Sequence, residues 1–428
     1  MLPSPFAVTA LAVEAVEDCA RAAAELGEAR GRPLPVIGVD TRAVAAAVSS
    51  ERHLRIAGER PVAWAPLSGF FAARDGWVRL HGNYPHHAAA ISRALGGADG
   101  VAAVREAVAE RAAADVEAAV VAAGGVAAAV RSSEAWRHSA EGAAAAAAPL
   151  VERRATGAGR TALPGVVSPV GAPASRLRVL DLTRVLAGPV AGRCLALWGA
   201  EVLRIDPPDR PEIAAQHVDM DAGKYSSRLD LRDPTGAERM RALAADADVV
   251  LLGYRPGALA SLGLGADDLL TDAPHLVVVE LSAWGWTGPW AERRGFDSIV
   301  QAACGIAERC AAPDGAPGAL PAQVLDHATG YRAAAAALRG LAARPARGGV
   351  RLRLSLAAAA AELIRLGVSG AGLPSPQDTG YDPALYVRTD GEVTTVRPPF
   401  TLDGVTRDYP FPARPYGADA PRWRDPAS

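Results

Sequence analysis

The sequence predicts an α/β protein built on a doubly wound parallel sheet, with a smaller α+β domain beside it. Residues 178–206, RVLDLTRVLAGPVAGRCLALWGAEVLRID, show the pattern of a strand, a Gly/Pro turn, a helix and a second strand, which is a βαβ unit. Strands and helices then continue to alternate, as they do in a Rossmann-like sheet. The unit begins well past the first third of the chain, so we expect another domain before it.

The first part of the chain predicts helices and one hairpin. Residues 7–57 show two amphipathic, Ala-rich helical patterns, and GFFAARDGWVRLHG at 69–82 predicts a hairpin that turns at Asp75-Gly76. A helix is expected at 85–95, and the Ala run at 143–148 predicts another. We assign residues 1–151 to the smaller domain and the Gly- and Pro-rich residues 152–176 to a linker.

Residues 177–366 predict the sheet domain. Strands are expected at 178–182, 201–206, 226–231, 248–253 and 275–283, and helices at 189–198, 234–246, 256–262, 297–309, 327–343 and 356–366. Residues 367–428 are Pro-rich, with one hairpin expected at Asp390-Gly391. They are too few to form a core of their own, so we expect them to pack against the rest of the chain.

Composition narrows the choice of partners and compartment. A net charge of −2 argues against nucleic acid or an anionic membrane as the main partner. The four cysteines lack CxxC spacing, and acidic residues interrupt the first apolar run, so we expect a reduced, cytoplasmic protein without a signal peptide. The uncharged, apolar run 118–130 is too short to span a bilayer. His86-His87 has no ligand companions at metal-binding spacing, so no metal site is expected.

The turn after the first strand of the βαβ unit argues against a dinucleotide. Ala187-Gly188-Pro189 stands where a GxGxxG fingerprint would lie. The chain also contains no Walker A, HExxH or GxSxG sequence. We therefore expect a ligand crevice at the carboxyl ends of the strands, with a ligand other than a dinucleotide.

Asp326, in the stretch QVLDHATGY at 323–331, stands at the predicted start of a long Ala-rich helix. One interpretation is an N-cap, in which the carboxylate accepts backbone N–H bonds and complements the helix dipole. The other is a nucleophile, because the same placement would lower the pKa of Asp326 and keep it ionised. Spacing alone favours the cap.

Five segments follow one another along the chain. They are the βαβ unit at 178–206, GKYSSRLDL at 223–231, GYRPGALASLGLG at 253–265, SAWGWTGPWAERRGFDSIVQAACG at 282–305, and Asp326 ahead of its helix. In this order they resemble the family III CoA-transferases, the group of carnitine, formyl and oxalate CoA-transferases and of 2-methylacyl-CoA racemases. The resemblance covers about residues 176–366 and implies the fold of that family.

The resemblance implies covalent catalysis at Asp326. Its carboxylate would attack an acyl-CoA thioester and give a mixed anhydride, and the returning CoA thiolate would give an aspartyl-CoA thioester that a carboxylic acid then takes up. Backbone N–H groups near the helix start would stabilise the oxyanions. Acyl-CoA and a carboxylic acid are the expected substrates, with no tightly bound cofactor.

The resemblance also implies a CoA site. Its residues would be Arg184, Val185, Leu186 and Ala187 at the thiol and pantetheine end, Lys224 and Arg255 at the phosphate or adenine end, and Gly285. The alternative for Lys224 and Arg255 is an ordinary solvated charge.

Several departures from the family pattern leave two other functions open. Tyr225-Ser226 stands where the family often has Arg-Ser, and Ser261 replaces an arginine, so a catalytically silent acyl-CoA-binding protein is one alternative. An acyl-CoA racemase or hydratase-like protein is the other. The racemase branch carries a histidine where this chain has Phe296, and phenylalanine cannot transfer a proton. The resemblance therefore favours the transferase.

Residues 60–150 resemble the small domain that normally follows the catalytic helix in this family. We therefore expect a rearranged order, with the small domain placed N-terminally. Family members form interlocked dimers. A homodimer is expected here as well, and whether it interlocks is left open.

Overall fold

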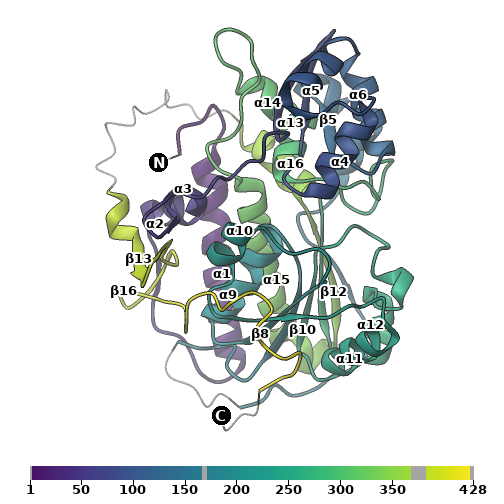
Figure 1. Cartoon of the computed structure of the whole chain (residues 1–428). Helices are drawn as coiled ribbons and strands as arrows, with labels where there is room; N and C mark the ends of the chain where they lie inside the picture. Colours follow the sequence, from purple (N-terminus) through teal and green to yellow (C-terminus); the bar gives the residue numbers. More distant parts are fainter. Residues whose placement is uncertain (1, 166–170, 368–381, 425–428) are drawn as a thin grey trace.

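A seven-stranded sheet forms the centre of the molecule (Figure 1). The computed structural model describes residues 2–165, 171–367 and 382–424. The parallel strands are β7 (Arg178–Leu182), β8 (Glu201–Asp206), β9 (Lys224–Arg228), β10 (Val249–Leu252), β11 (Val277–Ser282) and β12 (Val350–Ser355). Their spatial order is β9-β8-β7-β10-β11-β12, the order of a Rossmann-like, doubly wound sheet. From β7, the strands β8 and β9 follow towards one edge of the sheet, and β10, β11 and β12 follow towards the other. The topological switch point therefore lies between β7 and β10.

Helices cover both faces of the sheet. Val179, Val249 and Val277 face a core that contains α9 (Ala187–Leu197) and α15 (Val324–Arg347). The residues that follow each of them, such as Leu180, face a second core with α11 (Pro234–Ala245) and α12 (Ala266–Asp272). Successive side chains of a strand point to opposite faces, and a strand buried on both faces is apolar throughout. The apolar runs of the sequence are explained by this two-sided burial.

The first helix belongs to the sheet domain, so the predicted boundary at residue 151 is wrong for this helix. α1 (Val8–Ala29) packs along α15, and its apolar residues share the same core. Figure 1 shows the two helices side by side. Both helices are rich in buried alanines, such as Ala15 and Ala22 on α1 and Ala334 on α15. Small side chains let helix backbones approach closely, so an Ala-rich helix far away in sequence fits against α15.

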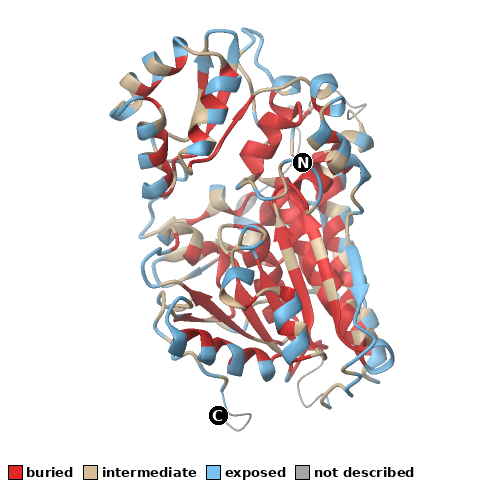
Figure 2. Cartoon of the chain, turned by 90° about the vertical axis from the view of Figure 1, so that its right-hand side faces the viewer, coloured by how far each residue is buried: buried red, intermediate tan, exposed pale blue. Residues whose placement is uncertain are grey.

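The predicted linker is partly wrong as well. Residues 152–155 form strand β6 (Glu152–Ala155), which pairs antiparallel with β12 at one edge of the sheet. Neither β6 nor β12 was predicted. All four residues of β6 are exposed, and Figure 2 shows this edge strand in pale blue against the buried strands beside it. An exposed, charged edge strand looks like a loop in sequence because one of its edges and both faces meet water.

A smaller α+β unit lies above the sheet domain in Figure 1. It contains β3 (Gly69–Ala73), β4 (Gly76–Leu80), β5 (Ala127–Ala129), α4 (Pro85–Ala94), α5 (Gly100–Ala109) and α6 (Ala113–Ala122), followed by α7 (Ser133–Arg137) and α8 (Ala140–Ala147). The predicted hairpin at 69–82 and the helix at 85–95 are confirmed by β3, β4 and α4. The unit has its own core, which includes Val78, Ile91 and Val116.

Two predicted helices take a different form. Residues 256–262 contain only a 3₁₀ turn, η1 (Ala260–Leu262), and residues 297–309 form α13 (Asp297–Ala303) and α14 (Ile306–Arg309). The break falls at Gly305, which has φ +86°. A Cβ there would lie 2.3 Å from the backbone nitrogen of Ser133, so the close approach of the α+β unit requires glycine.

The described part of the C-terminal segment is paired with N-terminal strands. The hairpin predicted at Asp390-Gly391 is formed by β13 (Val387–Asp390) and β14 (Val393–Val396), and β14 pairs with β2 (Arg55–Ile56). β15 (Phe400–Leu402) pairs with β1 (Ile37–Val39) and with β16 (Val405–Thr406). Short elements, namely α2 (Thr41–Ala47), α3 (Ser50–His53), α10 (Ala214–Met220), α16 (Leu356–Leu366) and η2 (Pro383–Tyr386), complete the chain. In the described part of the chain, no helix is both long and apolar enough to cross a membrane.

Candidate active site

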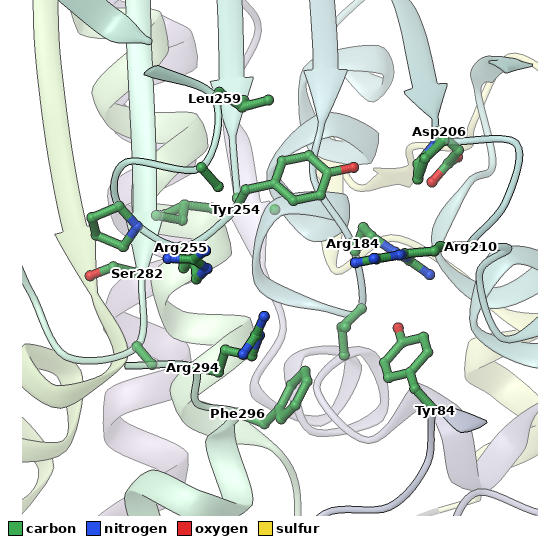
Figure 3. A pocket seen from close by; sticks show the side chains of 18 of the residues that line it. Tyr84, Arg184, Asp206, Arg210, Tyr254, Arg255, Leu259, Ser282, Arg294 and Phe296 are labelled. Carbon is green, nitrogen blue, oxygen red and sulfur yellow. The ribbon is translucent and has the colours of Figure 1, made fainter. Parts of the chain in front are cut away.

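A cleft of about 430 Å³ lies at the carboxyl ends of the parallel strands, around the switch point between β7 and β10. Loops that follow β7, β8, β9, β10 and β11 line it on the side of the sheet domain. Tyr84, His86 and His87 line it from the α+β unit, and Figure 3 shows Tyr84 at the cleft. The position is the one at which open α/β sheets bind their ligands.

Asp326 lines this cleft from the first turn of α15. Its side chain is almost entirely buried, and Oδ2 has no hydrogen-bond partner among the described residues. The helix start is capped by a different carboxylate: Asp297 Oδ2 accepts the backbone N–H groups of Leu325 and Asp326, at N···O distances of 2.9 and 3.2 Å. Asp297 therefore caps the helix, which is the role that one interpretation of the sequence gave to Asp326. The Asp326 side chain lines the cleft instead.

The environment of Asp326 opposes its charge. Burial raises the pKa of Asp326 well above its ordinary value, and the negative charge of Asp297 raises it further. Burial also raises the pKa of Asp297, to about 6, while its hydrogen bonds from Gln301 and from the helix start counteract that rise. The sequence-based expectation of a lowered pKa for Asp326 is wrong, because the N–H groups that would stabilise its charge donate to Asp297. The N–H groups of Leu325 and Asp326 are likewise not free to hold an oxyanion.

Three of the four residues after β7 that were predicted to bind CoA line the cleft. Arg184, Val185 and Ala187 line the cleft, whereas Leu186 is buried and faces a smaller neighbouring cavity. Val185 has φ +70°, an unfavourable conformation for a β-branched residue, and its N–H donates to Glu212 Oε2 at 2.9 Å. The Arg184 guanidinium lies 5.0 Å from the centre of the Tyr84 ring, and its Nε is 3.6 Å from Glu212 Oε2.

The prediction that Lys224 lies at the phosphate or adenine end of CoA is wrong, and so is the alternative of a solvated charge. Its ammonium is fully buried, with Nζ 2.8 Å from Asp181 Oδ2 and 2.9 Å from Asp221 Oδ1, and it does not line the cleft. Two carboxylates already neutralise it, so no charge is left for a ligand. Gly285 does not line the cleft either, although its neighbours Ser282 and Ala283 do.

Three arginines converge on the cleft with little compensating charge. Arg255, as predicted from the sequence, lines the cleft, and Arg210 and Arg294 join it (Figure 3). Burial lowers the pKa of Arg294, and the positive charges of Arg255 and Arg210 lower it further. Within the described residues, Arg255 and Arg294 form no ion pair, and Arg210 has only Asp209, at 3.9 Å. Mutually repelling guanidinium groups at one site suit an anionic ligand with several phosphates.

Sequence reasoning missed Arg210, Arg294 and the aromatic residues of the α+β unit. Arg210 follows β8 and Arg294 follows β11. The carboxyl ends of parallel strands lie at the same edge of a sheet, where ligands bind. The position of these arginines after predicted strands could therefore have indicated that they belong to the site. The aromatic residues were not identifiable in this way, because they come from a unit distant in sequence. The described residues contain no group of three or more His, Cys, Asp or Glu side chains arranged to hold a metal.

Comparison with known proteins identifies the segment that carries this cleft. Residues 175–379 match the model of CoA-transferase family III. This segment belongs to that family. A probable fatty acyl-CoA transferase of Mycobacterium tuberculosis is 37% identical over 189 residues, which cover 41% of this chain and 48% of the relative. The mouse succinyl-CoA:glutarate CoA-transferase is 34% identical over 184 residues, or 40% of this chain and 42% of that enzyme.

The match to this family is partial in length. The chain covers less than half of each of these two relatives. A crystal structure of a protein from Mycobacterium tuberculosis aligns with a TM-score of 0.43 at 35% identity, covering 45% of this chain and 56% of that one. The family segment includes Asp326 and all the cleft residues of the sheet domain.

Proposed function

We propose that this protein is a CoA-transferase that moves CoA from an acyl-CoA donor to a carboxylic acid through Asp326. The observation that carries the proposal is the Asp326 carboxyl group, which lacks a partner on Oδ2 and faces a cleft lined by three poorly paired arginines. Membership of residues 175–379 in CoA-transferase family III supports the same reaction class.

CoA would lie along the cleft with its phosphates at the arginines. Figure 3 places Arg255 and Arg294 on one side of the cleft and Arg184 and Arg210 on the other. A guanidinium group binds a phosphate through two parallel N–H···O bonds, which fixes the ligand's position as well as its charge. The thiol end would then reach towards Asp326, past the apolar surface of Val185 and Ala187.

The reaction would proceed through two kinds of covalent intermediate. An Asp326 oxygen attacks the thioester carbonyl carbon, the C–S bond breaks, and CoA leaves as a thiolate, which gives a mixed anhydride. The thiolate then attacks the Asp326 carbonyl carbon of the anhydride, so the donor acid leaves and an aspartyl-CoA thioester remains. The acceptor carboxylate repeats these two steps in reverse, taking CoA and restoring Asp326.

The buried setting of Asp326 affects this chemistry in two ways. The carboxyl group must lose its proton before it attacks, and its raised pKa makes the ionised form less populated. Once formed, a carboxylate whose Oδ2 has no hydrogen-bond partner among the described residues is poorly stabilised and hence more reactive. Exclusion of water also protects the anhydride and thioester from hydrolysis.

A transfer assay tests the proposal. Purified protein is incubated with a panel of acyl-CoA donors and carboxylic acids, and new acyl-CoA is measured by mass spectrometry. We expect transfer with at least one pair, and a fall of about a thousandfold or more in Asp326→Asn. Asp99→Asn, which changes an exposed carboxylate on the α+β unit, serves as the control and should keep full activity. Binding of CoA without transfer from any donor would contradict the proposal and support a silent acyl-CoA-binding protein.

The racemase alternative has its own readout. Deuterium incorporation at the α-carbon of an acyl-CoA in heavy water, without transfer, would favour the racemase. We expect none by the family's histidine route, because Phe296 lines the cleft at the position of that histidine. The expected homodimer and the cytoplasmic location stay predictions.

A further inference from the structure

An aromatic cluster from both parts of the molecule forms one wall of the cleft. The rings of Phe296 and His81 stack with centroids 3.9 Å apart and an interplanar angle of 15°. His87 meets Phe296 edge to face at 5.8 Å, and Tyr84 lies at 6.4 Å from it. Phe296, Tyr84 and His87 line the cleft, and Figure 3 shows the Phe296 and Tyr84 rings on the same side of it. The segment 81–87 of the α+β unit thus completes a pocket that begins on the sheet domain.

His87 brings a hydrogen-bonding group without a positive charge. Its side chain is 4% exposed, and Nδ1 has no hydrogen-bond partner among the described residues. Burial lowers the pKa of His87 to about 3, and the positive charges of His86, Arg294, Arg184 and Arg210 act in the same direction. A neutral imidazole offers one donor and one acceptor. An unsatisfied buried nitrogen costs about 1–3 kcal/mol, which a bound ligand can recover.

Two arginines that adjoin this wall already have carboxylate partners. Arg184, over the Tyr84 ring, pairs with Glu212, and Arg293 lies 2.9 Å from Glu117. The three poorly paired arginines would be occupied by the phosphates of CoA in the proposed function. With the phosphates of CoA on these arginines, including Arg294 beside Phe296, a second carboxylate on the acyl group would enter an aromatic wall with no cation left to pair it, and burying an unpaired charge is costly.

We infer that Tyr84, His87 and Phe296 form the acyl subsite, and that this subsite selects a monocarboxylic acyl group with a planar, aromatic or unsaturated body over a dicarboxylic one. Aromatic rings gain from edge-to-face and offset contacts with another flat group. The inference rests on the proposed function, because it requires CoA in the cleft.

Binding measurements test the subsite without relying on transfer. In the Asp326→Asn background, where transfer is blocked, calorimetry gives the dissociation constants of CoA, benzoyl-CoA and succinyl-CoA. We expect benzoyl-CoA to bind about tenfold more tightly than succinyl-CoA. CoA without an acyl group reports the rest of the cleft, and its unchanged affinity in each variant shows that the fold is intact.

Two substitutions of His87 sharpen the test. His87→Ala should reduce the preference for benzoyl-CoA to about threefold or less while leaving CoA affinity unchanged. His87→Arg adds a cation and should shift the preference towards succinyl-CoA. His138→Ala, an exposed histidine at the end of α7, is the matched control and should leave both preferences unchanged.

The failures of the two proposals are distinguishable. Equal affinities for the two acyl-CoAs, or a preference for succinyl-CoA, in protein that binds CoA would overturn the subsite and leave the transferase proposal standing. Binding of none of the three ligands would overturn both. A benzoyl-CoA preference in a protein that transfers nothing would support the subsite alone.

Discussion

Lys224 and Arg255 show two opposite uses of a cation in the same domain. Lys224 is fully buried between Asp181 and Asp221, and the nearby Arg204 is held 2.7 Å from Asp206 and 2.6 Å from Asp221. Arg255, in contrast, is exposed at the cleft and forms no ion pair with the described residues. Fixed carboxylates inside the protein hold Lys224 and Arg204, whereas Arg255 has no carboxylate partner among the described residues.

The difference shows how a structural cation can be told from a ligand-binding one. A buried cation must have carboxylate partners, because a buried charge without a partner strongly destabilises the folded protein. A cation that binds a ligand must keep its charge uncompensated until the ligand arrives. Burial and pairing, which sequence spacing does not contain, separate the two classes here.

The largest expected effect concerns Lys224. Lys224→Met leaves the buried Asp181 without its ion-pair partner, whereas Asp221 keeps Arg204, so the free energy of unfolding should fall by about 3–5 kcal/mol. Denaturant unfolding measures the change. The fraction that remains folded should bind CoA with unchanged affinity. A stable variant that has lost CoA binding would reverse the assignment and return Lys224 to the ligand site.

The next prediction concerns Arg255, for which we expect the opposite result: an almost unchanged free energy of unfolding and weaker CoA binding. Arg255→Ala should change the free energy of unfolding by less than about 0.5 kcal/mol, because the side chain is exposed and unpaired. It should weaken CoA binding by about tenfold through the loss of charge-assisted hydrogen bonds. Calorimetry with CoA measures the affinity, and Arg137→Ala, an exposed arginine on α7, is the control. Equal CoA affinities in the two variants would remove Arg255 from the site.

The sequence was sufficient for five of the seven strands of the sheet and for the location of the site, because both depend on local patterns. The strands at 178–182 and 201–206 match β7 and β8 residue for residue, and Asp326 lies at the expected edge. It was insufficient where distant segments meet. The packing of α1 on α15, the capping of α15 by Asp297, and the ring of His87 against Phe296 all join residues far apart in the chain.

A further prediction concerns the pH dependence of stability. The pKa of Asp326 is raised in the folded protein, whereas an unfolded aspartate titrates near pH 3.9, so the folded state binds more protons above that pH. The free energy of unfolding of the wild type should therefore fall relative to Asp326→Asn as pH rises from about 4 towards the pKa of Asp326 in the folded protein, by about 1.4 kcal/mol for each pH unit. Thermal unfolding at pH 4 and pH 7.5 measures this. A wild type that gains stability relative to the variant over this range would show that Asp326 is stabilised as an ion.

In the proposed mechanism, the carboxyl group of Asp326, unpartnered at Oδ2, forms a covalent bond during transfer. Intact-protein mass spectrometry after incubation with the acyl-CoA that is active in the transfer assay tests for this bond. We expect an added mass equal to CoA less water, located on the peptide that contains Asp326 and absent in Asp326→Asn. Transfer that proceeds at a normal rate in Asp326→Asn, or an adduct located on another residue, would contradict it.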